Sequence, residues 1–238
     1  MTNEVFQFDL NRKIPKTQNT NENKFNIGSV FSTPIYRAQL DYKISEKDNN
    51  NLNKIIETKD VKIKEGKCTQ SKDVFVFDTF FQKLKEEILI HLNNYIEKIH
   101  NPAEEFKIKI TQSWLNFYNN QQSIHEHNHP NSFISGGYYF KTRKEDVIVF
   151  RDKNFIERYG FQFKLKEITK FNQENIVAKV EEGILMLFPS SVNHYVSKFP
   201  RNKWVNEDSD KIVRISLSVN TYISGYIGSI DNLTFLEL

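Results

Sequence analysis

Apolar positions recur at two periods along this chain, and the change of period separates a helical part from a β part. Between residues 78 and 100 apolar side chains recur every three to four positions, which predicts one helix of about six turns, ended by Pro102. Its apolar stripe consists of Phe81, Leu84, Ile88, Leu92, Tyr95 and Ile99. A shorter helix is predicted from residue 45, where a polar Ser-Glu-Lys-Asp start precedes apolar residues at helical spacing.

After residue 105 the period falls to two, which is typical of strands that are half buried in a sheet. The first such strand runs from 106 to 118, and its two faces stay unchanged if no bulge intervenes. Further strands are predicted at 133–140, 147–150, 176–180, 184–188 and 211–222. Two short strands are predicted before the long helix, at 27–36 and 74–77.

Two helices followed by seven or eight strands predict a mostly β fold in which the helices pack on one sheet of a sandwich or barrel. Residues 1–25 are polar and are predicted to form a flexible arm, which leaves residues 26–238 as a single domain. The charged segment 151–174 and the polar segment 200–210 are predicted to be excursions over the surface.

Composition narrows the class of protein. The chain has 238 residues, is 38% hydrophobic and contains 20 Phe, which is enough for a substantial core. A net charge of +3, with both signs interspersed, gives no reason to expect a nucleic-acid or membrane partner. The single cysteine, Cys68, excludes an internal disulfide and fits a reducing compartment. Because no signal peptide or membrane span is evident, we expect a cytoplasmic protein.

Three of the six histidines lie within five residues, at positions 125, 127 and 129. Residues two apart on an extended chain point to the same side, so either His125 with His127 or His127 with His129 could bind one metal ion. Outside the helical region only His194 remains to complete the site. The alternative is a polar loop that is rich in His and Asn. The chain is rich in Asn throughout but not in His, which favours the metal site.

The last long strand has one apolar and one polar face. Val213, Ile215, Leu217 and Val219 alternate with Arg214, Ser216, Ser218 and Asn220. If the apolar face packs on the helices, the polar face lines the interior, where a buried Arg214 requires an anion such as a carboxylate. The alternative is an exposed polar face with Arg214 in water.

The strand after the histidine cluster is predicted to face the same cavity. If its parity continues from His127 and His129, the side chains of Ser135, Gly137 and Tyr139 share their side. The two glycines of this strand leave open space, and Trp114 and Asn116 could form the opposite wall.

These motifs together resemble a known family. The order of Trp114-Leu-Asn116, the segments 127–132, 135–139 and 183–190, His194, and the segment 214–220 is similar to that of the 2-oxoglutarate- and Fe(II)-dependent oxygenases. The resemblance is greatest to a small branch found in marine bacteria and phages, and it covers roughly residues 28–222. It implies a double-stranded β-helix, that is, a jelly-roll or cupin-like barrel with N-terminal helices on one sheet.

The resemblance also implies the site residues and the chemistry. His127, His129 and His194 would bind Fe(II). Arg214 would bind 2-oxoglutarate, helped by Tyr139, Asn116 and Ser216. Such enzymes use O2 and couple decarboxylation of 2-oxoglutarate, which gives succinate and CO2, to oxidation of a second substrate. A hydroxylation of an unidentified substrate is expected here.

One position departs from the family pattern. His129 stands where the wider family has Asp or Glu, so three neutral ligands would leave two positive charges on the ion. Glu126 does not have the spacing to replace the carboxylate, and Asp152 is left as the other candidate for that role. Pro130 favours an extended His129, which supports the pair His127 and His129.

Two other functions remain open at this point. A three-histidine site could hold catalytic zinc in a hydrolase or hydratase. A barrel without catalysis could bind a small acid. The tail 223–238 is apolar enough to pack on the domain or on a second copy in a homodimer.

Overall fold

A computed structural model describes residues 32–57, 61–62, 67–103, 106–155, 160–161, 164–169, 171–197 and 211–238. The chain divides into the units Met1–Thr33 and Pro34–Leu238, and every element below lies in the second unit. The predicted arm 1–25 and the predicted loop 200–210 lie outside the described residues, as do residues 27–31 of the predicted strand 27–36. Within the described part, no helix is long and apolar enough to span a membrane.

The first helix, α1 (Glu46–Glu57), begins where the polar start predicts it. The Asp48 N–H donates to Ser45 Oγ over 3.1 Å, and the Ser45 N–H donates to Asp48 Oδ2 over 3.1 Å. This reciprocal capping satisfies two backbone donors that have no partner within the helix. Leu52 then buries its side chain in the core.

The predicted long helix is interrupted. It consists of α2 (Val76–Thr79), α3 (Gln82–Tyr95) and the π-helical turn η1 (Ile96–His100). The break lies at Phe81, whose φ of 59° is left-handed. The change to π-helical winding explains why the predicted stripe is wrong at its end: Ile96 is buried, whereas Ile99 is exposed. The other stripe positions are buried as predicted.

The strand predicted at 74–77 is also wrong. Val76 and Phe77 belong to α2, where both are almost fully buried in the core. A short apolar run is compatible with a buried strand and with a buried helical turn, and periodicity does not separate the two.

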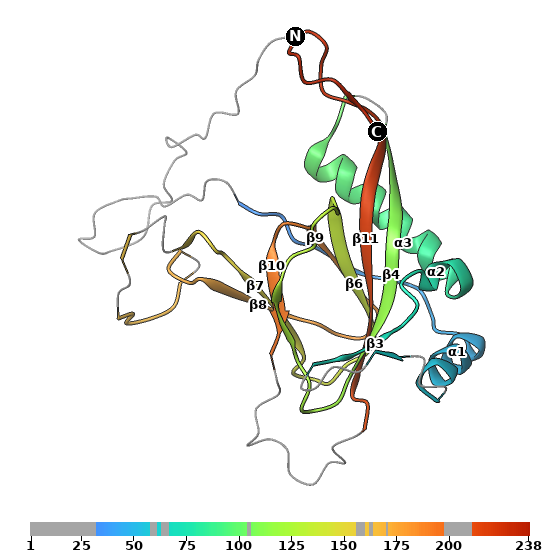
Figure 1. The fold of residues 1–238 in the computed structure, drawn as a ribbon. Helices are drawn as coiled ribbons and strands as arrows, with labels where there is room; N and C mark the ends of the chain where they lie inside the picture. Colours follow the sequence, from blue (N-terminus) through green and yellow to red (C-terminus); the bar gives the residue numbers. More distant parts are fainter. Residues whose placement is uncertain are drawn as a thin grey trace, which may run out of the picture. The chain divides into compact units, whose positions relative to one another are not determined.

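The strands form two antiparallel sheets (Figure 1). The larger has the order β1-β9-β6-β11-β4-β3-β2, and β12 pairs with β11. Its strands are β1 (Tyr36–Gln39), β2 (Val61–Lys62), β3 (Thr69–Ser71), β4 (Phe106–Tyr118), β6 (Ile134–Lys141), β9 (Ile184–Pro189), β11 (Arg214–Ile227) and β12 (Leu236–Glu237). The smaller has the order β5-β10-β7-β8 and consists of β5 (Ile124–His127), β7 (Val147–Arg151), β8 (Asn175–Lys179) and β10 (Asn193–Val196).

From β4 onward the chain passes back and forth between the sheets. β4, β6, β9 and β11 lie in the larger sheet, and β5, β7, β8 and β10 lie in the smaller one. This alternation is the arrangement of a double-stranded β-helix, and the predicted fold class is confirmed. Helix α3 runs alongside the larger sheet (Figure 1), with Leu84, Ile88 and Leu92 fully buried in the core that it shares with that sheet.

The two faces of β11 divide as predicted. Ile215, Leu217 and Val219 belong to the core shared with α3, whereas Arg214 and Ser216 line a cavity on the other face. On β4 the parity is not continuous, because the register shifts between Gln112 and Ile110. The prediction of unchanged faces along this strand is therefore wrong, and the bulge lies at Thr111. Before it the even-numbered residues pack in the core, and after it they line the cavity.

The neighbouring glycines of β6 have different surroundings. A Cβ on Gly136 would lie 2.5 Å from the Met186 carbonyl oxygen and 2.6 Å from Leu187 Cδ2. A Cβ on Gly137 would have its nearest neighbour, the Leu217 carbonyl oxygen, at 3.7 Å. Only the first position is closed to a side chain.

We therefore expect Gly136→Ala to lower the free energy of unfolding by about 1–3 kcal/mol, because a backbone carbonyl would have to move. Gly137→Ala is the matched control and should leave that free energy almost unchanged or slightly higher. Urea denaturation of both variants measures the difference. Equal destabilisation would contradict the assigned orientation of β6.

Candidate metal centre and anion pocket

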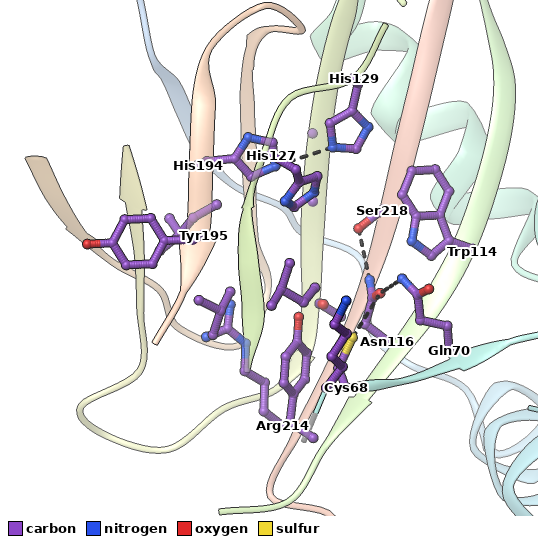
Figure 2. Close-up of a pocket in the computed structure, with 18 of the residues that line it drawn as sticks. Cys68, Gln70, Trp114, Asn116, His127, His129, His194, Tyr195, Arg214 and Ser218 are labelled. Atoms are coloured by element: carbon purple, nitrogen blue, oxygen red, sulfur yellow. Dashed lines mark hydrogen bonds between the residues drawn. The ribbon is translucent and has the colours of Figure 1, made fainter. Parts of the chain in front are cut away.

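A cavity of about 370 Å³ is lined by residues of both sheets. The larger sheet contributes residues of β3, β4, β6, β9 and β11, and the smaller sheet contributes residues of β5, β7 and β10. Figure 2 shows the three histidines His127, His129 and His194 gathered in one part of it, with Arg214 in another part. No Asp or Glu is among the described residues that line this cavity.

The three histidines come together from two chain segments. His127 on β5 pairs directly with His194 on β10, so sheet register places both. His129 lies in the loop that follows β5, and its backbone N–H donates to the Ser190 carbonyl over 2.9 Å. One nitrogen from each ring lies within 4.8 Å of the others. Among the described residues, this is the only group of His, Cys, Asp or Glu arranged to hold a metal ion.

Hydrogen bonds fix which nitrogen of each ring is protonated. Nδ1 of His127 lies 2.8 Å from the His125 carbonyl, Nδ1 of His194 lies 3.0 Å from the Val192 carbonyl, and Nδ1 of His129 lies 2.7 Å from Asn220 Oδ1. Oxygens of this kind only accept, so each Nδ1 carries the hydrogen and each Nε2 presents a lone pair.

The lone pairs are brought close together. Nε2 of His129 and Nε2 of His194 are 3.3 Å apart. Two lone pairs at this distance repel unless a proton or a metal cation lies between them. The donor set therefore fits a transition-metal ion, for which neutral imidazole is a common ligand.

Burial keeps these rings neutral. Desolvation is the main cause that lowers the pKa of His129 to about 4 and that of His194 to about 3, and it also lowers the pKa of His127. At neutral pH all three imidazoles are therefore available as ligands.

Arg214 is a buried cation with an incomplete set of partners. It is 2% exposed, and its Nη1 donates to the Val147 carbonyl over 3.0 Å. Its guanidinium carbon lies 5.1 Å from the ring centres of both Tyr118 and Tyr139. Nε has no hydrogen-bond partner, and no carboxylate of the described residues forms an ion pair with this guanidinium. Such a group is stabilised by an anionic ligand.

A family comparison agrees with this geometry. Residues 112–220 match the family model described as "Putative 2OG-Fe(II) oxygenase". Residues 112–220 are therefore similar to this oxygenase family. The matched segment contains all three histidines and Arg214, and the family's name agrees with Fe(II) and 2-oxoglutarate, the cofactors predicted from the sequence.

Solved structures of similar fold show low sequence identity to this chain. A 2OG-Fe(II) oxygenase-family oxidoreductase from Burkholderia pseudomallei is 11% identical over 68% of this chain and 65% of its own, just under two thirds, with a TM-score of 0.40. A prolyl-4-hydroxylase from Pseudomonas putida is 8% identical over 81% and 92%, with a TM-score of 0.45. HygX from Streptomyces hygroscopicus, with nickel and 2-oxoglutarate bound, is 8% identical over 79% and 82%, with a TM-score of 0.48. No curated protein matches the chain. The family match covers residues 112–220, which is less than half of the chain.

The other residues predicted to bind 2-oxoglutarate differ in whether their polar groups are free to hydrogen-bond a ligand. Tyr139 and Ser216 are buried and line the cavity, and burial raises the pKa of Tyr139, so its hydroxyl remains a donor. Asn116 also lines it, but its Oδ1 accepts from Gln70 over 2.9 Å and its Nδ2 donates to Ser218 over 2.9 Å. The amide of Asn116 is therefore largely engaged in holding the cavity wall.

Glu126 and Asp152, the two acidic residues that could replace the carboxylate ligand common in the wider family, lie outside the group of three histidines. Glu126 accepts from Arg151 over 2.7 Å and from Asn193, and the Asn193 hydrogen bond is the main cause that lowers its pKa. Asp152 caps a turn by accepting from the Asn154 N–H. His125 is exposed and lies outside the group of three, although it lines the outer cavity.

Sequence reasoning missed the contribution of β3. Gln70 on β3 and Cys68 just before it line the cavity, but no hydrophobic period marks their segment in the sequence. Trp114 was expected at the wall, yet its contact was not: the indole stacks on His129 with the ring centres 5.7 Å apart.

The metal-free protein should lose stability as the pH falls from about 6.5, the value for an unfolded chain. The folded pKa is about 4 for His129 and about 3 for His194, so between about pH 6.5 and 4 only the unfolded state takes up protons at these two residues. The folded pKa of His127 is lowered as well. The stability that these neutral imidazoles contribute is fully present above the unfolded pKa and is lost as the pH falls below it. Urea midpoints at pH 7.5 and 5.5 should fall further for the wild type than for His194→Gln. An equal fall in both proteins would contradict burial as the cause.

Proposed function

We propose that this protein is an Fe(II)- and 2-oxoglutarate-dependent dioxygenase that hydroxylates an unidentified substrate and releases succinate and CO2. The observation that carries the proposal is the pairing of two features in one cavity. Three Nε2 atoms converge there, and a buried guanidinium lacks a carboxylate partner among the described residues. A metal ion and a small dicarboxylate would satisfy both.

His127, His129 and His194 would hold the metal. When bound, Fe(II) together with O2 and 2-oxoglutarate supplies the oxidising power, because decarboxylation of the cosubstrate is coupled to oxidation of the second substrate. The chain's own part is to keep three imidazoles neutral and to direct their lone pairs to one point. Phe188 packs against the His194 ring, with ring centres 4.7 Å apart, and helps to exclude water from this side.

Arg214 would bind the carboxylate of 2-oxoglutarate that lies away from the metal. A guanidinium can donate two parallel hydrogen bonds to one carboxylate, and the free Nε of Arg214 provides a donor for this purpose. The Tyr139 hydroxyl and Ser216 Oγ are placed on the same cavity wall and would add donors.

The absence of a carboxylate ligand changes the charge of the site. Three neutral histidines would leave the full charge of a divalent ion, and Arg214 adds one more positive charge. Two of these charges would be balanced by dianionic 2-oxoglutarate, which supports binding of metal and cosubstrate in one complex.

A zinc hydrolase is supported less well. Such an enzyme needs a general base near the metal-bound water, and no Asp or Glu is among the described residues that line the cavity. Glu126 is held by Arg151 and Asn193 instead. Arg214 would also have no role in that mechanism.

The assignment of the ligand pair is tested by three substitutions. His129→Ala should lose most metal affinity, because it removes one of three donors. His125→Ala is the matched control from the same segment and should retain it, because that ring is exposed and outside the group. His129→Asp should retain a working site, since two histidines and one carboxylate are a common Fe(II) ligand set.

Iron content after anaerobic loading and succinate formation measure these variants. The opposite order, with iron lost in His125→Ala and kept in His129→Ala, would move the ligand register by two residues.

Arg214→Ala should abolish 2-oxoglutarate binding while leaving metal affinity intact. Losing one partner of a buried charge pair costs about 3–5 kcal/mol, and Lys at this position should restore only part of it because it offers a point charge. Anaerobic calorimetric titration of 2-oxoglutarate into the metal-loaded variants measures the effect. A loss of a buried charge pair lowers affinity far more than threefold. If Arg214→Ala bound 2-oxoglutarate within about threefold of the wild-type affinity, the anion would have to bind at another site.

A further inference from the structure

The third histidine is held differently from the other two. His127 and His194 stand opposite each other in the pair β5–β10, so the backbone places both. His129 lies two residues beyond the end of β5, where no strand partner fixes its side chain. Its ring therefore needs support from other side chains to direct Nε2 into the group.

Asn220 supplies a hydrogen bond to this ring. It lies on β11, opposite Gln112 of β4 and Ser135 of β6, and is 9% exposed. Its Oδ1 lies 2.7 Å from Nδ1 of His129. Stacking on Trp114 restrains the plane of the imidazole. The hydrogen bond also determines which way the ring is turned and which nitrogen is protonated.

The Asn220 amide is itself fixed in orientation. Oδ1 accepts a second hydrogen bond, from Ser135 Oγ over 2.9 Å, and Nδ2 donates to Gln112 Oε1 over 3.3 Å. Both lone pairs of Oδ1 are therefore used. In a flipped amide, the NH2 group would face the Ser135 hydroxyl and Nδ1 of His129, which are both hydrogen-bond donors in this arrangement.

A buried serine cluster connects this amide to the His129 loop. Because the Ser135 hydroxyl donates to Asn220, Ser190 Oγ is the donor to Ser135 Oγ over 2.7 Å. Ser132 Oγ lies 2.8 Å from Ser190 Oγ. The carbonyl of Ser190 also accepts the His129 N–H. Backbone and ring of His129 are therefore held by one connected set of hydrogen bonds.

We propose that Asn220 is the positioning residue for His129, and that its side-chain carbonyl keeps Nδ1 protonated and Nε2 directed toward the metal position. The part that concerns a metal rests on the proposed function. The tautomer of His129 is a property of the metal-free protein and is testable separately. Asn220 is a neutral amide, so it adds no negative charge beside the His129 imidazole. A carboxylate at this position would add one.

Three variants separate hydrogen bonding from packing. Asn220→Leu keeps similar bulk but removes the acceptor, and Asn220→Asp keeps an acceptor at the same place. Ser218→Ala is the matched control, because it lies on the same face of β11 and its hydroxyl contacts Asn116. A thermal melt of each variant checks that it is folded.

The first readout is the ¹⁵N NMR spectrum of the imidazoles in the metal-free protein. Wild type, Asn220→Asp and Ser218→Ala should show His129 with Nδ1–H alone, and Asn220→Leu should show a mixture with Nε2–H. The second readout is Co(II) titration, in which Asn220→Leu should weaken binding about 10–100-fold and the other two variants should stay within about threefold.

A pure Nδ1–H tautomer in Asn220→Leu would overturn the proposal. So would an equal loss of Co(II) affinity in Asn220→Leu and Asn220→Asp, because the role would then be packing. A wild-type protein that binds no Co(II) would contradict the proposed function, while the NMR spectra would still decide the role of Asn220.

Discussion

The two-residue alternation of β11 is the constraint on which both the core and the cavity depend. This strand is paired on both sides, with β4 and β6. Its apolar residues Ile215, Leu217 and Val219 join the core shared with α3, and its polar residues face the cavity. A shift of one residue would place Arg214 against the helices and remove the apolar face from the core. Core packing therefore also fixes the position of Arg214 in the cavity.

The cavity contains one buried cation, Arg214, and no carboxylate among its described lining residues. Arg214 is buried, the three histidines are neutral, and the acidic residues nearest in sequence pair elsewhere. In sites built from two histidines and one carboxylate, the carboxylate ligand offsets part of the metal charge. Here that task would pass to the cosubstrate, so metal and 2-oxoglutarate should stabilise each other's binding.

Much of this arrangement could be predicted from the sequence, because strand residues alternate strictly. The alternation from Arg214 to Asn220 indicated the buried cation, and the spacing of the histidines limited the ligand pair to two choices. The family resemblance supplied the fold and the role of Arg214. The pairing of His127 with His194 across β5 and β10 could not be predicted, because it depends on which strands become neighbours in the fold and no local sequence pattern encodes that.

The errors have identifiable physical causes. The bulge at Thr111 is a one-residue insertion relative to β11, so it appears only when both strands are paired. The π-helical turn after Tyr95 changes which face Ile99 occupies, and local propensity does not signal it. The link from Asn220 to His129 joins residues 91 positions apart in the chain.

The most direct test of the account is a crystal structure of the protein grown without O2, with Mn(II) and 2-oxoglutarate. The account predicts one metal ion about 2.0–2.3 Å from Nε2 of His127, His129 and His194. It also predicts a carboxylate of 2-oxoglutarate on the guanidinium of Arg214. A metal bound elsewhere, or a 2-oxoglutarate molecule that does not contact Arg214, would contradict it.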